Sequence, residues 1–514
     1  MSQPLVPVAK ATAQRTQERA ELDVREVAVI DVGSNSVRLV VFRVDGRAMT
    51  PILNEKVMAG LGRGIGESGF LNATGRQTAL AALRRFAALV NHMGIKTTHA
   101  VATAALREAR DGQAFAAQVN KETGIGLRII DGVEEGRLSA LGVLAGTPDA
   151  HGVVGDLGGS SLELATISPR GNGTALSYPL GPLALANGEA FDTDRVSAEI
   201  DHALRNTAVF QKSRGSTFYA VGGAWRALGR IDVTLRDHPL SVLHQHHMTR
   251  ADTLKVVEFV RKQSRRSLER FEEAAAKRAE ALPYAALTLQ RILELGGFER
   301  VILSSYGLRE GLLFDAMAPQ VRAQDALIAA AEAFGAPSLR VRAFGDALAR
   351  FINPVFSAVP TAFSPAIDAR LRAAACRLAD IAAGLHPEQR GAIVFDLVVR
   401  APLAAITHAE RAFLAAAVHT RYTKSAPNAE ALINRLLTEP QIAQANILGL
   451  AMRLGAELSG RSAGLMSRFQ LRRTSDILKV VVRAEDAHLL TATSLRRLEP
   501  LANALGLRAE PAKD

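Results

Sequence analysis

The chain has 514 residues, of which 48% are hydrophobic and 22% are charged, so it has the composition of a globular protein rather than a disordered one. Its single cysteine, Cys376, excludes an intrachain disulfide and agrees with a reducing compartment, so we expect a cytoplasmic protein. The net charge of +11 favours a polyanionic partner, such as a phosphate chain, a nucleotide, nucleic acid or an acidic membrane surface, without choosing among them.

The N-terminal residues 1–24 are polar, and we expect them to form a flexible tail. They contain no hydrophobic run of the kind that a secretory signal requires. The chain has no uncharged hydrophobic stretch of about 18 residues, so we expect no membrane span.

From Val27 onward the pattern changes to strands and helices. VAVIDVG predicts a buried strand that ends in a glycine turn, and SVRLVVFRV predicts a second strand returning from it. A helix is expected over 74–92, capped by Thr74. Strands and helices then alternate: a strand over 97–102, a helix over 112–122, a strand over 127–130 and a helix over 134–145. This alternation predicts an α/β architecture.

A second strand, turn and strand are expected over 152–167, and FYAVGGAWRAL predicts a strand that ends at the pair Gly222 and Gly223. Helices are expected over 250–297, followed by a short strand in VILSS. Residues 320–435 are rich in Ala and Leu with helical spacing, and 440–514 mix a helix with at least one strand, LKVVVRA. We place domain boundaries near 145, 315 and 435.

An internal repeat is the strongest signal in the sequence. When VAVIDVGSNSVRLVVF is aligned with GVVGDLGGSSLELATI, the matched pairs are Asp31 with Asp156, Gly33 with Gly158, Ser36 with Ser161, and Arg38 with Glu163. An Asp at the end of a buried strand can hold Mg²⁺, often through water. Small residues in the turn leave backbone N–H groups free to bind phosphate. The repeat therefore predicts two turns that face one cleft and hold a phosphate from both sides.

Four segments in this order, IDVGSNSVRLVVF, ATAALREA, DGVEEGRLSALGVL and VVGDLGGSSLEL, together resemble the exopolyphosphatase and guanosine pentaphosphate phosphatase (Ppx/GppA) family. YAVGGAWRAL and SSYGLREGLL extend the resemblance to about residue 315. The resemblance implies an α/β catalytic core of the actin-like ATPase fold, made of two ribonuclease-H-like halves. We expect these halves at 25–145 and 146–315, followed by an α-helical HD-like domain at 316–435 and a small α+β domain at 436–514.

The resemblance also implies roles for individual residues. Glu135 matches the catalytic carboxylate that activates or orients the attacking water. Asp156 and Glu163 match metal ligands, and Asp31 is a further candidate from the repeat. The residues that match or extend the phosphate-contacting set are Asn35, Ser36, Arg38, Thr103, Arg107, Gly158, Ser160, Ser161, Gly222 and Gly223. The sequence departs from the family pattern at Leu162, which lacks the usual hydroxyl group.

These features lead us to expect an Mg²⁺-dependent phosphoanhydride hydrolase that removes terminal phosphate processively from inorganic polyphosphate. Another divalent ion, or a monovalent cation, could also serve. The motifs leave two alternatives open: a guanosine pentaphosphate 5′-phosphohydrolase, and a regulator that binds polyphosphate or nucleotide without turnover. We further expect a homodimer and no specific nucleic-acid partner.

Three other patterns receive no catalytic role. Gly64, Gly66 and Gly69 form a G-x-G-x-x-G but lack the preceding strand and following helix of a dinucleotide site. His244, His246 and His247 lack Cys or carboxylate partners at the usual spacing for zinc. No His is followed directly by Asp, so we expect no HD-type metal site around His386, His408 and His419.

Two basic clusters could guide a long phosphate chain across the surface. Their members are Arg261, Lys262, Arg265, Arg266 and Arg270, and then Arg461, Arg468, Arg472 and Arg473.

Overall fold

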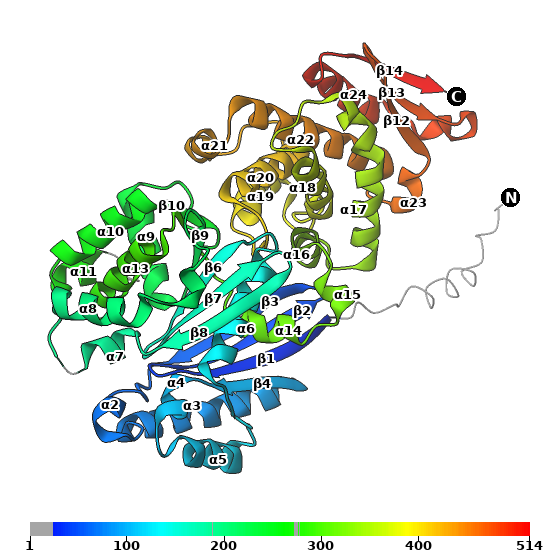
Figure 1. The fold of residues 1–514 in the computed structure, drawn as a ribbon. Helices are drawn as coiled ribbons and strands as arrows, with labels where there is room; N and C mark the ends of the chain where they lie inside the picture. The colour runs from blue at the N-terminus through cyan, green and yellow to red at the C-terminus, as the bar shows by residue number, and fades with distance from the viewer. Residues whose placement is uncertain (1–23, 188, 272–275, 277, 514) are drawn as a thin grey trace.

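The computed structural model describes residues 24–187, 189–271, 276 and 278–513. Residues 1–23 of the expected tail lie outside the described residues. Two mixed sheets, each with helices packed against it, form the N-terminal part, and a helical region with a third, small sheet follows (Figure 1).

The first sheet has five strands in the order β3-β2-β1-β4-β5. Their bounds are β1 Val24–Val32, β2 Val37–Asp45, β3 Ala48–Val57, β4 Thr97–Ala102 and β5 Arg128–Ile129. The helices in this part of the chain are α2 Ile65–Ser68, α3 Ala73–His92, α4 Ala104–Glu108, α5 Gly112–Thr123 and α6 Gly132–Gly146.

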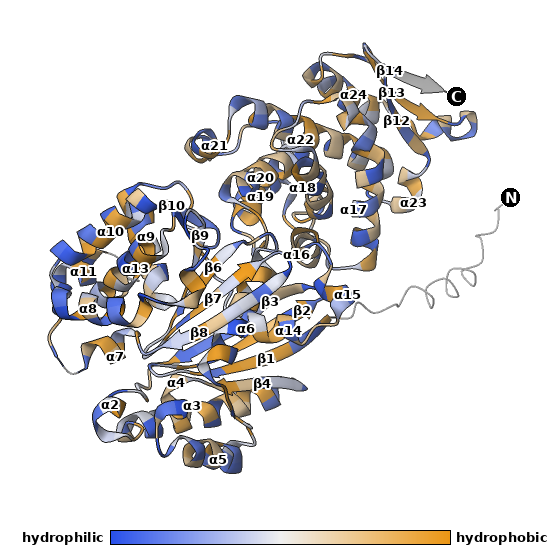
Figure 2. Ribbon diagram, viewed as in Figure 1, coloured by the Kyte–Doolittle hydropathy of each residue, from blue (hydrophilic) through white to orange (hydrophobic). Residues whose placement is uncertain are grey.

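Strand β1 is hydrophobic throughout its centre because both of its faces are covered (Figure 2). Ala28, Ile30 and Val32 pack into a core shared with α3 and α5. Val27 and Val29, on the other face, pack into a core shared with α6. Successive side chains of a strand point to opposite faces, so burial on both sides requires an unbroken hydrophobic run.

The second sheet has six strands in the order β10-β11-β9-β6-β7-β8. Their bounds are β6 Gly152–Leu157, β7 Leu162–Ser168, β8 Gly171–Tyr178, β9 Thr217–Val221, β10 His246–Thr249 and β11 Arg300–Leu303. The accompanying helices are α7 Pro182–Ala186, α8 Thr193–Leu204, α9 Gly223–Leu235, α10 Arg250–Lys262, α11 Arg265–Phe271, α13 Leu282–Gly296 and α14 Leu308–Asp315.

Helices α6 and α14 cross between the two sheets in direct backbone contact. A Cβ atom at Gly311 would lie 1.8 Å from the carbonyl oxygen of Leu138, and one at Gly142 would lie 2.1 Å from that of Gly307. Only glycine fits at such distances. This close crossing fixes the middle of α6 and the first turn of α14 relative to each other.

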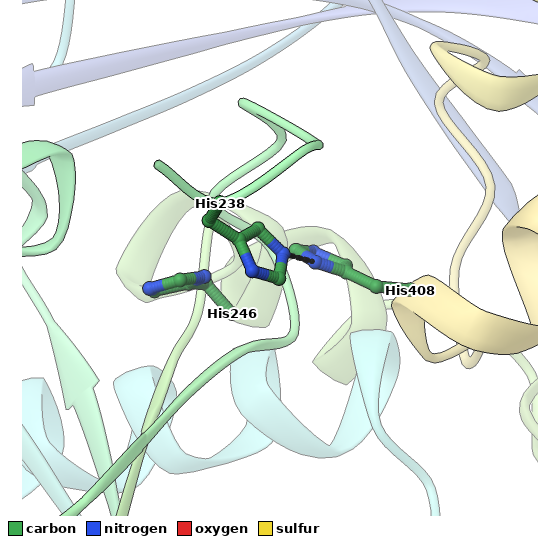
Figure 3. Close-up of side chains that lie close together, drawn as sticks. All are labelled: His238, His246 and His408. Atoms are coloured by element: carbon green, nitrogen blue, oxygen red, sulfur yellow. Dashed lines mark hydrogen bonds between the residues drawn. The ribbon is translucent and has the colours of Figure 1, made fainter. Parts of the chain in front are cut away.

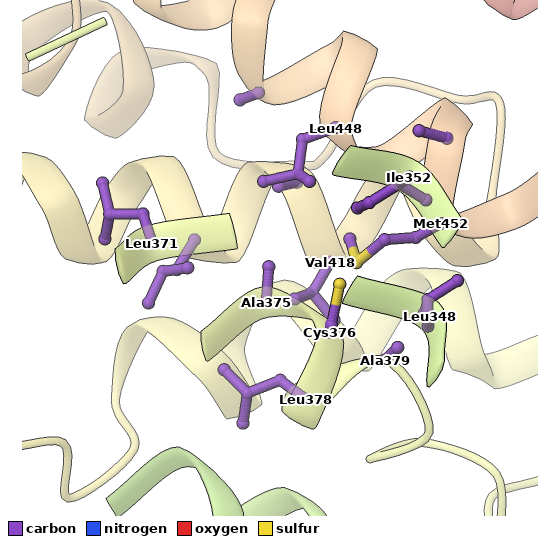
Figure 4. Close-up of a cluster of buried hydrophobic side chains, with 14 of the residues drawn as sticks. Leu348, Ile352, Leu371, Ala375, Cys376, Leu378, Ala379, Val418, Leu448 and Met452 are labelled. Atoms are coloured by element: carbon purple, nitrogen blue, oxygen red, sulfur yellow. The ribbon is translucent and has the colours of Figure 1, made fainter. Parts of the chain in front are cut away.

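The C-terminal part packs around one hydrophobic core that contains Cys376, draws its residues from Leu327 to Leu507 and also includes Leu240 (Figure 4). Its helices are α15 Pro319–Arg322, α16 Ala326–Gly335, α17 Leu339–Ile352, α18 Pro365–Leu378, α19 Arg390–Val399, α20 His408–Tyr422, α21 Glu430–Leu436, α22 Glu439–Ser459, α23 Ala463–Met466 and α24 Ala492–Ala504. Its sheet consists of β12 Phe469–Arg473, β13 Ile477–Val482 and β14 Arg508–Lys513, which lie farthest from the two larger sheets (Figure 1).

Several sequence expectations can be compared with these elements. The strand over 97–102 and the helices near 112–122 and 134–145 are confirmed as β4, α5 and α6. The expected cap of α3 is wrong, because Asn72 rather than Thr74 accepts the hydrogen bond from Gly75 N, at 2.9 Å. Among the described residues, no helix is both long and hydrophobic enough to cross a membrane.

Candidate active site

A cleft of about 600 Å³ lies between the two sheets, and both predicted turns line it. The predicted site residues that line the cleft are Asp31, Asn35, Ser36, Arg38, Thr103, Glu135, Asp156, Gly158, Ser161, Gly222 and Gly223. The expectation that Asp31 and Asp156 share one crevice is therefore confirmed.

The two turns have the same geometry. In the β1–β2 turn Gly33 N donates to Ser36 O at 3.0 Å, and in the β6–β7 turn Gly158 N donates to Ser161 O at 2.9 Å. The pairs that the repeat aligned occupy equivalent register positions. Asp31 lies opposite Arg38 across the first strand pair, and Asp156 lies opposite Glu163 across the second.

The tips of the two turns contact each other. A Cβ atom at Gly159 would lie 3.2 Å from the Cβ atom of Ser34 and 3.5 Å from that of Asn35. Any larger residue at position 159 would therefore press on the opposite turn. The small residues of both loops allow the turns to meet and expose their backbone at the cleft.

Glu135 lies in the first turn of α6, whose N-terminus is capped by Asp131 through a hydrogen bond from Glu134 N. Its carboxylate is buried and accepts a hydrogen bond from Arg107 Nη1 at 3.1 Å. The same Arg107 nitrogen donates to Ile130 O at 3.1 Å, which fixes the guanidinium. Burial, together with the nearby charge of Glu163, raises the pKa of Glu135 well above its ordinary value.

Asp156, which is half-buried, and Glu163, which is buried, form a group of carboxylates with Glu135. Ser139 donates to Asp156 at 2.5 Å, and Ser177 donates to Glu163 at 2.8 Å. Burial raises the pKa of both carboxyl groups. The Oε2 atom of Glu163 is buried without a hydrogen-bond partner.

This carboxylate group fits a divalent cation. Adjacent buried carboxylates repel one another, and a positive ion between them would offset both the repulsion and the loss of solvation. The unpartnered Oε2 atom of Glu163 is a free oxygen donor of the kind that Mg²⁺ prefers. Asp156 and Glu163 are therefore suitable ligands for such an ion.

Three predicted site residues lie behind the cleft wall rather than on it: Arg107, Ser160 and Glu163. Arg107 reaches the cleft through its bond to Glu135. Ser160 packs against the Gly62 loop, where a Cβ atom would lie 3.2 Å from its hydroxyl oxygen, and its carbonyl accepts from Gly181 N at 3.1 Å. Glu163 is buried beneath the cleft, opposite Asp156.

Asp31 pairs with an arginine that the sequence analysis did not select. Arg309, in the first turn of α14, donates to Asp31 Oδ2 at 2.7 Å. The guanidinium of Arg309 therefore occupies one oxygen of Asp31. The assignment of Asp31 as a metal ligand remains a prediction.

Several cations in the cleft were also missed: Lys56, Arg63, Arg226, Arg278 and Arg309. Burial, followed by the charge of Arg309, lowers the pKa of both Arg38 and Arg226 to about 10. These cations repel one another, and an anionic ligand would relieve that repulsion. Arg226 and Arg309 lie in GGAWRAL and YGLREGLL, so the segments that carried the family resemblance also contained these two cleft cations.

From the basic cluster at 261–270, Arg265 lines the cleft.

Comparison with known proteins agrees with this geometry. Residues 40–320 match the model of the Ppx/GppA phosphatase family, and residues 327–511 match a model described as the C-terminal part of exopolyphosphatase. Exopolyphosphatase 1 of Mycobacterium leprae is 26% identical over 301 residues, which cover 56% of this chain and 88% of that protein. Retrograde regulation protein 2 of Saccharomyces cerevisiae is 22% identical over 449 residues, covering 78% of this chain and 73% of that one.

A solved exopolyphosphatase structure from Cytophaga hutchinsonii has a TM-score of 0.52 and 21% identity, covering 56% of this chain and 97% of that one. This likeness shows the fold, and the expected actin-like ATPase core, followed by helical and C-terminal α+β parts, is confirmed. The family model covers residues 40–320, more than half of the chain. The chain therefore belongs to the Ppx/GppA phosphatase family.

Proposed function

We propose that this protein is an exopolyphosphatase that uses a divalent cation, Mg²⁺, to release terminal phosphate from inorganic polyphosphate. One observation carries the proposal: Glu135 lies beside a carboxylate pair, in a cleft that is lined by the two glycine turns and by several cations. The relative from Mycobacterium leprae is an exopolyphosphatase, which supports this substrate class.

The turns and cations suit a chain of phosphates rather than a single one. The turn at Gly33–Ser36 and the turn at Gly158–Ser161 can bind the terminal phosphoryl group through backbone N–H groups. Arg309 and Arg226 stand beside them and can donate charge-assisted hydrogen bonds to phosphate oxygens. Lys56 and Arg278 extend the positive charge along the cleft to the next phosphates.

In the proposed reaction a water oxygen attacks the terminal phosphorus, and the bond from that phosphorus to the bridging oxygen breaks. Glu135 accepts the proton of the attacking water, and Arg107 holds its carboxylate in position. The bridging oxygen leaves with the electron pair as the new chain end, and the cleft cations stabilise its charge. Asp156 and Glu163 would hold the divalent cation, which supplies positive charge that neutralises the phosphoryl oxygens.

The proposal is tested by incubating the purified protein with end-labelled long-chain polyphosphate, with Mg²⁺ and with EDTA. We expect free phosphate and a processive pattern, in which long chains persist while short intermediates stay scarce. Guanosine pentaphosphate serves as a competing substrate in the same assay. Phosphate release from guanosine pentaphosphate alone, or binding of polyphosphate without release, would overturn the proposal.

A further inference from the structure

Three histidines meet outside the cleft, where the second sheet contacts the helical region (Figure 3). His238 follows α9, His246 begins β10, and His408 begins α20. One ring nitrogen from each lies within 4.8 Å of the other two. Sequence spacing does not reveal this group, because 170 residues separate His238 from His408.

Two of the three rings have a tautomer that is set by a neighbouring acceptor. His246 Nε2 lies 2.7 Å from the buried carboxylate of Asp232, so this nitrogen carries the proton. His408 Nε2 lies 3.2 Å from the carbonyl oxygen of His244, so it carries the proton as well. In both rings Nδ1 is then left with a lone pair. A metal-binding histidine commonly has this arrangement, with its other nitrogen hydrogen-bonded to a carboxylate or carbonyl group.

One of these lone pairs has no partner inside the protein: His246 is fully buried, and its Nδ1 atom makes no hydrogen bond. His408 Nδ1 accepts a hydrogen bond from His238 Nε2 at 2.9 Å, which a bound ion would replace, with the proton of His238 moving to its Nδ1 atom.

We propose that His238, His246 and His408 bind a divalent transition-metal ion, with Zn²⁺ as the best-fitting ion, and that the ion ties the catalytic core to the helical region. Imidazole nitrogens suit Zn²⁺, and three of them leave a position for water. With Zn–N distances near 2.0 Å, tetrahedral ligand atoms lie about 3.3 Å apart. The pair at 2.9 Å needs to open by only a few tenths of an ångström.

The three histidines lie on both sides of the junction between the second sheet and the helical region. Other contacts already join these two parts. Ala405 N donates to Gly146 O at 2.8 Å just before α20, and Arg435 pairs with Asp237 at 3.0 Å beside His238. An ion at the histidines would add a bond between α20 and the strand β10. The site is separate from the carboxylates of the cleft, so it does not depend on the proposed hydrolase activity.

The test uses the full chain, freed of metal with EDTA and then titrated with Co²⁺ in millimolar Mg²⁺, which competes with Co²⁺ at the cleft carboxylates. We expect one Co²⁺ ion per chain with the visible absorption of a tetrahedral nitrogen site, and Zn²⁺ should displace it. His238→Gln should weaken Co²⁺ binding by at least about ten-fold. Zn²⁺ should raise the thermal midpoint of the wild-type protein but not of this variant.

The matched control is His247→Gln, because His247 is the next residue on β10 and its side chain is exposed on the other face of the strand. It should bind Co²⁺ as the wild type does. His408→Gln provides a second ligand variant, with folding of each variant checked by circular dichroism in EDTA. Equal Co²⁺ binding by the wild type and both ligand variants would overturn the proposal, as would an equal loss in His247→Gln.

Discussion

Replacing Glu135 with glutamine removes one negative charge and the proposed proton acceptor while preserving the shape of the side chain. The amide oxygen can still accept the hydrogen bond that Arg107 donates to Glu135 at 3.1 Å. Loss of a general base typically costs 10²–10⁴-fold in rate, which corresponds to about 3–5 kcal/mol of activation free energy. We therefore expect kcat for polyphosphate hydrolysis to fall by at least about 100-fold, with KM changed little.

The assay measures phosphate release from long-chain polyphosphate under Mg²⁺ saturation, over a range of substrate concentrations. Glu134→Gln is the matched control, because it removes the same charge one residue away. Glu134 is bonded to Arg137 at 2.7 Å and does not line the cleft. A rate for Glu135→Gln within a few-fold of the wild-type rate, or an equal loss in Glu134→Gln, would refute the assigned role of Glu135.

Replacing Glu135 with glutamine should also change how the stability of the protein depends on pH. The pKa of Glu135 in the folded protein lies above its ordinary value, mainly through burial, so the folded state favours the protonated form. Protonation of Glu135 therefore contributes to the stability of the wild-type protein. This contribution is fully present below the ordinary pKa of glutamate and is lost as pH rises through the raised pKa of Glu135 in the folded protein. Glutamine does not titrate. In EDTA, the thermal midpoint of Glu135→Gln should therefore exceed that of the wild type at pH 8, and the difference should shrink toward pH 4.

Three further changes test other parts of the structure. Arg309→Gln removes a charged donor from the cleft, so KM for polyphosphate should rise by about 10-fold or more in a Michaelis analysis, whereas an unchanged KM would count against its role in binding. Gly311→Ala would place a Cβ atom 1.8 Å from Leu138 O, so chemical denaturation should show a loss of about 1–3 kcal/mol. Burial raises the pKa of Cys376 to about 12, so a thiol reagent should label it only after denaturant is added, and rapid labelling of the native protein would contradict its placement in the core (Figure 4).

Local patterns in the sequence predicted much of the core. The repeat aligned Asp31 with Asp156, and the structure places both at the ends of equivalent strands in one cleft. This succeeded because a strand, a glycine turn and a returning strand are all encoded within about 16 consecutive residues. Strand β4 and helices α5 and α6 were predicted for the same reason, since their hydrophobic spacing is local.

The remaining site residues depend on packing between distant segments. Arg309 looks like an ordinary surface residue of a helix in the sequence, and it meets Asp31 only because α14 crosses α6 in backbone contact. The histidine group has the same origin, since His408 reaches His238 only when the helical region docks on the second sheet. Spacing along the chain carries no record of such contacts, so the sequence did not predict that His246 lies close to His238 and His408.

The distribution of charge in the cleft explains why the proposed reaction needs two ligands. The carboxylates Glu135, Asp156 and Glu163 belong to α6 and the β6–β7 pair, and burial raises the pKa of each. The cations Arg226 and Arg309 come from α9 and α14. A cation suits the first group and a phosphate suits the second, because like charges lie close together within each group, although Arg107 pairs with Glu135 and Asp31 pairs with Arg309. Binding both ligands together therefore relieves repulsion on both sides, at the point where water must reach the phosphorus.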